Sequence, residues 1–148
     1  MTIILRPAAI ALTLVFFGSC AAPKAPDPTA QSLVESVAAN NKDVVRLTVH
    51  AIPAGEKDYK AVASTLASKL GQPSDAEDLK AINTGEVVVL EESAGLDVTV
   101  PIRMQGGRHT AAAGVTIKSG VAREAAITQA KAIAAEIDRG LTATPMKK

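Results

Sequence analysis

The chain has 148 residues, and its 16 lysines and arginines nearly balance 15 aspartates and glutamates, for a formal net charge of +1. This balance excludes the basic excess that nucleic-acid binding normally requires. The chain has one tyrosine, no tryptophan and two phenylalanines, both within the first 17 residues, so the remainder lacks the aromatic platforms on which single-stranded bases stack.

Residues 1–19 have the three parts of a secretory signal. Residues 1–6 carry one positive charge, residues 8–17 are apolar, and Gly18 and Ser19 are small residues that precede a cleavage point. A membrane-spanning helix needs about 20 consecutive apolar residues, and this stretch is too short. We therefore expect the segment to be removed.

Cys20 follows the signal directly and is the only cysteine. The run Phe17-Gly18-Ser19-Cys20 resembles the lipobox of bacterial lipoproteins, with phenylalanine where that family usually has leucine. The resemblance implies that the Cys20 sulfur is acylated, and several acyl chains hold a protein firmly in a lipid bilayer. Because Ala21 stands where aspartate favours inner-membrane retention, the resemblance also implies an outer-membrane lipoprotein that faces the periplasm of a Gram-negative host. The alternative is an ordinary signal peptide with an incidental cysteine.

Segment 20–30 contains three prolines, which predicts an extended tether between the lipid and the domain. A single domain is expected over 31–141, followed by a tail over 142–148. It begins with a helix over 31–40, whose apolar residues recur at helical spacing. A strand over 44–52 follows, because this segment is rich in β-branched residues.

The next segment, 58–70, predicts a second helix, because its apolar residues form one stripe at helical spacing. Ser74 and Glu77 have the spacing of a capping box, which predicts a short third helix that ends at Gly85. Another strand is expected over 87–92.

The clearest pattern is the alternation of apolar and polar residues over 96–104, which predicts a strand with one buried face. Gly106-Gly107 is typical of a hairpin turn into a returning strand over 108–118. This turn pairs Ile102 with Ala111, Val100 with Ala113, Val98 with Val115 and Leu96 with Ile117, and on the other face Asp97 with Thr116. The loop Ser93-Ala94-Gly95 similarly aligns Leu90 with Val98 and Val88 with Val100.

A long helix over 121–141 has an apolar stripe of Ala126, Ala130, Ile133, Ile137 and Leu141. This order of elements predicts an α+β fold in which an antiparallel meander sheet carries helices on one face. The stretch 44–117 resembles the PAS-like or Cache-type extracytoplasmic sensor domains of bacteria. The resemblance is carried by Leu70-Gly71-Gln72-Pro73-Ser74-Asp75, by Leu96-Asp97-Val98-Thr99-Val100-Pro101-Ile102 and by Ala113-Gly114-Val115-Thr116. It implies a binding or accessory component.

Four residues are candidates for ligand binding: His109, Met104, Arg103 and His50. His109 is expected opposite Met104 at the rim of the buried face, where a titratable ring can meet a ligand or serve as an ordinary edge residue.

Two polar strand faces, Arg46-Thr48-His50 and Asp97-Thr99-Arg103, bind a small anion if the strands are neighbours, or are an exposed polar sheet face. The small residues of 111–114 leave room for a ligand or let the last helix pack closely.

Metal chemistry has little support, because His50 and His109 are 59 residues apart and acylation leaves no thiol. We expect no metal and no cofactor, and no motif positions a catalytic nucleophile.

The favoured hypothesis is a non-catalytic lipoprotein whose domain binds a small molecule or an envelope protein. It predicts a pocket between the sheet and the helices that contain Asp58 and Ser74, lined by aliphatic groups with a few polar contacts. The alternatives are an interaction protein without a small ligand and a small hydrolase or isomerase that uses His50 or His109.

Overall fold

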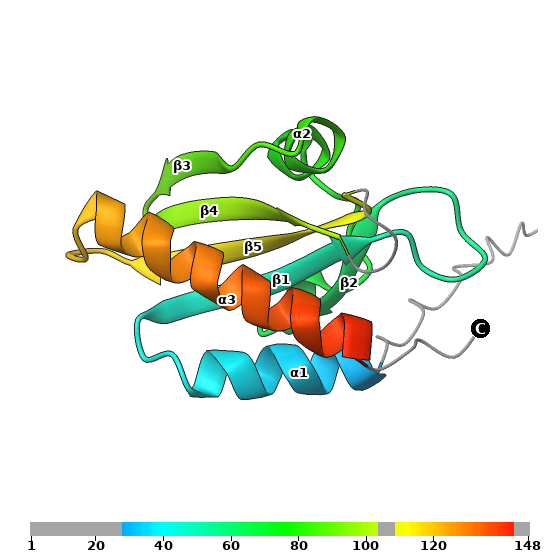
Figure 1. Ribbon diagram of the computed structural model, residues 1–148, viewed down its shortest axis with the longest axis horizontal. Coiled ribbons are helices and arrows are strands. Elements are labelled where there is room, and N and C mark those ends of the chain that lie inside the picture. The colour runs from blue at the N-terminus through cyan, green and yellow to red at the C-terminus, as the bar shows by residue number, and fades with distance from the viewer. Residues whose placement is uncertain (1–27, 104–108, 144–148) are drawn as a thin grey trace, which may run out of the picture.

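The computed structural model describes residues 28–103 and 109–143. Within these ranges the chain forms a five-stranded antiparallel sheet, in the order β2-β1-β5-β4-β3, and three α-helices (Figure 1). The elements are α1 (Pro28–Ala39), β1 (Val44–Ala51), β2 (Lys60–Ser64), the 3-10 helix η1 (Ala67–Lys69), α2 (Ala76–Thr84), β3 (Val88–Glu92), β4 (Gly95–Ile102), β5 (Ala111–Lys118) and α3 (Arg123–Ala143). The expected α+β class is confirmed. The signal segment, Cys20, Met104 and Gly106-Gly107 lie outside the described residues.

The core lies between the sheet and the two long helices, α1 and α3, which pack side by side on one face (Figure 1). The apolar stripe expected on the last helix is buried at every position, with its members at most 2% exposed. Alanines contribute many of the core side chains, so the helices approach the sheet closely. The short helix α2 lies over one end of the opposite face, where Ala81 and Ile82 pack on Ala112.

The predicted register of the β4–β5 hairpin is confirmed, including the pair Asp97–Thr116. The prediction for β3 was wrong by one residue, because Glu92 pairs with Gly95 and leaves a two-residue turn. Gly95 has φ 147° and packs against the Ile117 backbone, which allows it to join the strand. Leu90 therefore lies opposite Asp97 on the face that α2 partly covers, and it is 40% exposed.

The helix predicted over 58–70 is wrong. Residues 60–64 form the edge strand β2, which pairs with β1, and η1 follows. The Gln31 side chain also bonds both backbone groups of Ser64, at 2.9 Å each. Residues distant in sequence therefore supply the hydrogen bonds of the β2 backbone. These bonds outweigh the local apolar pattern, which is short enough to fit either a helix or a strand.

The helix ends also differ from expectation. α1 starts three residues early, at Pro28, because proline is tolerated in the first turn of a helix. Asp75, and not Ser74, caps α2, and its reciprocal partner is Asp78. α2 ends at Gly85, as predicted, and this glycine has a left-handed conformation. None of the helices in the described ranges has the length and apolar character needed to cross a bilayer.

Candidate functional site

Polar side chains form rows across the sheet face on the α2 side. Strand β5 separates the two polar strands singled out in the sequence, but all three share this face. One row joins Arg46, Thr116 and Asp97 across β1, β5 and β4, and the next joins Thr48, Gly114 and Thr99. Because Gly114 has no side chain, the sheet has a hollow at the centre of the second row.

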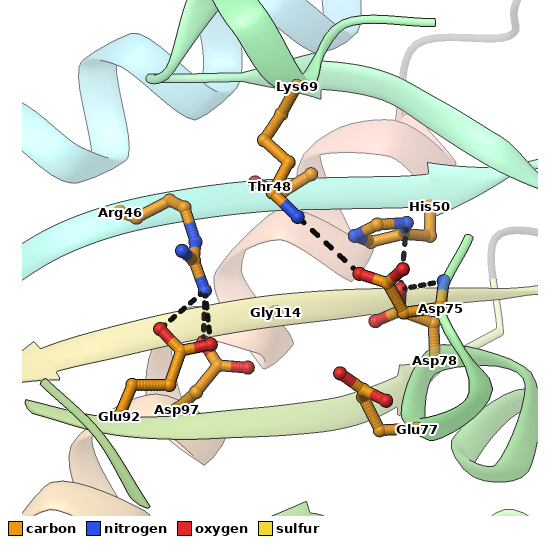
Figure 2. Close-up of a pocket in the computed structure, with 10 residues that line it drawn as sticks. All are labelled: Arg46, Thr48, His50, Lys69, Asp75, Glu77, Asp78, Glu92, Asp97 and Gly114. Atoms are coloured by element: carbon orange, nitrogen blue, oxygen red, sulfur yellow. Dashed lines mark hydrogen bonds and ion pairs between the residues drawn. The ribbon is translucent and has the colours of Figure 1, made fainter. Parts of the chain in front are cut away.

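A small pocket lies over this hollow, between the sheet and the start of α2 (Figure 2). Its lining consists of Arg46, Thr48, His50, Lys69, Asp75, Glu77, Asp78, Glu92, Asp97 and Gly114. The cavity volume is about 30 Å³, which is enough for about two water molecules or for one compact head group. A pocket was expected between the sheet and the helices of Asp58 and Ser74. The observed pocket lies beside α2, its lining is polar and not aliphatic, and neither Asp58 nor Ser74 lies in a helix.

His50 and Asp78 form the buried end of this pocket. The His50 Nδ1 atom lies 3.2 Å from Asp78 Oδ2 and 3.0 Å from Ser74 Oγ. Asp78 Oδ2 also accepts the backbone N–H of Asp75 at 2.9 Å. The two side chains are only 8% and 6% exposed, so α2 holds a carboxylate against an imidazole with little solvent between them.

Burial shifts the pKa values of both groups. Desolvation lowers the pKa of His50 from its ordinary value near 6.5 to about 4 and raises the pKa of Asp78 to about 6, because a charge is costly in a site with little water. At pH 7 the imidazole is therefore neutral and Asp78 is ionised. An ionised carboxylate only accepts hydrogen bonds, so it places the imidazole proton on Nδ1 and leaves Nε2 as an acceptor.

Arg46 closes the opposite end of the pocket. Its guanidinium lies 3.1 Å from Glu92 and 3.2 Å from Asp97, and Asp97 also accepts the Thr116 hydroxyl at 2.6 Å. Burial alone lowers the pKa of Arg46, but the two carboxylates raise it above its ordinary value. This cation is therefore engaged by two acidic partners, which argues against the small-anion site that was one of the two alternatives for these strand faces. The other alternative, an exposed polar face, does not describe Thr48, Asp97 and Thr99, which are buried.

The third side of the pocket is acidic. Lys69, from η1, places its Nζ 3.4 Å from Asp75 Oδ2, and Glu77 completes the lining. In total five carboxylates and two cations surround the cavity, so its formal charge is negative by three units when His50 is neutral. A site of this kind favours cations and hydrogen-bond donors.

Of the four residues predicted to bind ligand, His50 lines the pocket. Arg103 is exposed and lies outside the pocket, and its backbone N–H donates a hydrogen bond to Asp138 Oδ1. The His109 ring lies against Gly85, at the end of α2, and Met104 is outside the described residues. The sequence reasoning missed the acidic run that starts α2 and also Lys69. The signal that could have identified the acidic run is the presence of three carboxylates within residues 75–78.

The geometry does not resemble a nucleophilic relay. Ser74 and Asp78 contact the same imidazole nitrogen, whereas a relay places the hydroxyl and the carboxylate on opposite nitrogens. With its pKa near 4, His50 is also a weak base at neutral pH. Within the described ranges, no three His, Cys, Asp or Glu side chains are grouped so that they could hold a metal ion.

The fold is that of known solved structures, although no family model and no curated protein matches the sequence. A free methionine-R-sulfoxide reductase from Neisseria meningitidis, solved with its substrate, aligns with a TM-score of 0.55 at 12% identity over 79% of this chain and 80% of its own. The type II enzyme from Thermoplasma acidophilum gives 0.53 at 12% over 80% and 93%. The GAF domain of an Acinetobacter phosphoenolpyruvate-protein phosphotransferase gives 0.53 at 15% over 78% and 91%. These similarities show a GAF-like fold.

Proposed function

We propose that this chain is a non-catalytic binding domain that takes a small polar molecule in the pocket over Gly114. One observation carries the proposal: buried polar side chains from β1 and β4, together with Asp78 of α2, converge on a cavity whose floor is Gly114, which has no side chain. The GAF-like fold supports it, because one of the similar structures was solved with its substrate bound. The sensor role expected from the sequence is the biological setting that we propose for this binding.

Native mass spectrometry of the full chain, purified from its own membrane, tests the binding proposal. The variant Gly114→Val fills the cavity from a central strand position that favours β-branched residues. Ala125→Val adds similar bulk to an exposed position on α3 and is the control. We expect a non-lipid adduct on the native and control chains and none on Gly114→Val. A bare native chain, or the same adduct on all three, contradicts the proposal.

We further propose that acylation of Cys20 holds the domain at the periplasmic surface of an outer membrane. The support is the sequence alone, in which an apolar segment and two small residues precede that cysteine. Intact mass after membrane fractionation is the test. The mature chain should begin at Cys20, carry acyl mass and stay with the membrane, and Cys20→Ser should not. A native chain that starts at another residue, or that fractionates with soluble proteins, contradicts this part.

An enzymatic role has weaker support from the pocket. Reduction of a sulfoxide removes an oxygen atom and requires two electrons, which proteins commonly supply from thiols. The residues that line this pocket include no cysteine, so we do not extend the reductase activity of the two similar structures to this chain. His50 also lacks the hydroxyl–imidazole–carboxylate order that a hydrolase of the relay type needs.

A further inference from the structure

The charge around the pocket is divided unevenly between its two ends. Arg46 lies between Glu92 and Asp97, which leaves one net negative charge at that end. At the α2 end, Lys69 faces Asp75 alone at 3.4 Å, and no ion pair in the described ranges involves Glu77. Asp78 adds a carboxylate whose partner is a neutral imidazole. Two of the three net negative charges around the cavity are therefore at the α2 end.

His50 adds a hydrogen-bond acceptor that is independent of these carboxylates. Its Nδ1 is used by Ser74 and Asp78, and within the described residues its Nε2 has no partner. Figure 2 shows this second ring nitrogen on the side of the imidazole that faces away from Asp78. It lies 3.9 Å from the position that a Gly114 side-chain carbon would occupy. No fully enclosed side-chain nitrogen or oxygen in the described ranges lacks a partner, so this nitrogen is reached from the cavity.

The ammonium group of Lys69 is already part of the pocket lining. Lys69 enters from the η1 side and directs its Nζ toward the Asp75 carboxylate (Figure 2). Its side chain is 36% exposed and that of Asp75 is 57% exposed, so this contact is weak and solvated. The lysine ammonium can therefore leave, and the carboxylate that it faces is suited to another cation of the same kind.

We propose that the pocket over Gly114 binds the primary ammonium group of a small amine, which donates to His50 Nε2 and to the carboxylates at the start of α2, with Lys69 as an internal competitor. This inference rests on the proposed function and names its ligand class. The cavity of about 30 Å³ accommodates a bare ammonium and leaves the rest of the amine at the pocket mouth. A quaternary ammonium has no N–H to donate and is too large.

Titration calorimetry of the full chain with four small compounds tests the proposal. Propylamine, propionate, 1-propanol and propyltrimethylammonium each contain an unbranched chain of three carbons and differ in their polar groups. We expect binding of propylamine alone, and its loss in Gly114→Val. Because a partly exposed ion pair contributes about 0.2–1 kcal/mol, Lys69→Gln should tighten propylamine binding by up to about fivefold. Lys80→Gln makes the same charge change on an exposed residue of α2 outside the pocket and should leave it unchanged.

The outcomes separate this inference from the proposed function. If propionate or propanol binds in place of propylamine and Gly114→Val abolishes that binding, the ammonium site is wrong and the pocket still binds ligands. If no compound binds but the native chain carries an adduct that Gly114→Val lacks, the inference is again overturned alone. If no compound binds and the native chain carries no adduct in mass spectrometry, the ammonium-site inference and the proposed function are both wrong. Equal effects of Lys69→Gln and Lys80→Gln refute the role of Lys69 as competitor.

Discussion

The buried pair of His50 and Asp78 predicts an unusual pH dependence of stability. His50 has a lowered pKa in the folded chain, so its contribution is present above pH 6.5 and is lost as the pH falls toward about 4. Asp78 has a raised pKa, so its contribution is present below pH 3.8 and is lost as the pH rises through about 6. Between pH 6 and 4 the unfolded pair holds one proton on the histidine and the folded pair holds one on the aspartate. The two effects therefore nearly cancel in the native chain.

Single substitutions should reveal the two opposite slopes. Each full pKa unit corresponds to about 1.4 kcal/mol. With Asp78→Asn, the free energy of unfolding should fall by about 3 kcal/mol, relative to the native chain, as the pH decreases from 7 to 4. With His50→Gln it should instead rise by about 3 kcal/mol over the same range.

Urea unfolding of the three proteins, followed by circular dichroism at several pH values, measures these changes. Other titrating groups are common to all three proteins and cancel in the comparison. Slopes of the same sign in both variants, or slopes no different from that of the native chain, refute the argument that burial controls both pKa values.

Two further predictions concern the backbone. Gly95→Ala should destabilise the chain by about 3 kcal/mol or more in urea unfolding, because φ is 147° and the new carbon overlaps the Ile117 carbonyl. Gly120→Ala, with positive φ but open space around it, should cost about 1 kcal/mol, and equal losses would contradict the steric argument. Asp75→Ala should cost about 1 kcal/mol and speed amide exchange in the first turn of α2. Ser74→Ala should leave that exchange unchanged, because Asp75 is the N-cap residue. Faster exchange in the Ser74→Ala variant would show that Ser74 caps the helix and would contradict this assignment.

Local sequence patterns predicted the elements whose interactions are mainly local or strictly periodic. The β4–β5 register could be predicted because a one-residue slip moves every apolar side chain to the wrong face. The apolar stripe of α3, from Ala126 to Leu141, is equally regular over about four turns. The segment that became β2 has only five strand residues, and its backbone partners come from β1 and from Gln31. No pattern within that segment distinguishes a strand from a helix.

The candidate site was harder to predict than the fold, because its residues come from six elements. The polar faces of β1 and β4 could be recognised by their alternation, but their distance across β5 depends on the strand order. The error over 58–70 also misplaced Lys69, and a capping box assigned one residue early obscured Asp75 and Asp78. The charge of the pocket, and with it the ligand class, followed only from these tertiary positions.

The most direct test of the account is the nitrogen NMR spectrum of the His50 ring in the full chain, recorded at pH 7 with and without propylamine. We predict an unprotonated Nε2 and a protonated Nδ1 in the free chain. We also predict that saturating amine moves the Nε2 resonance, and that the Gly114→Val variant shows no such shift. A protonated Nε2 in the free chain, or a resonance that stays in place while the amine is bound, would contradict the claim that this nitrogen is the open acceptor of a ligand site.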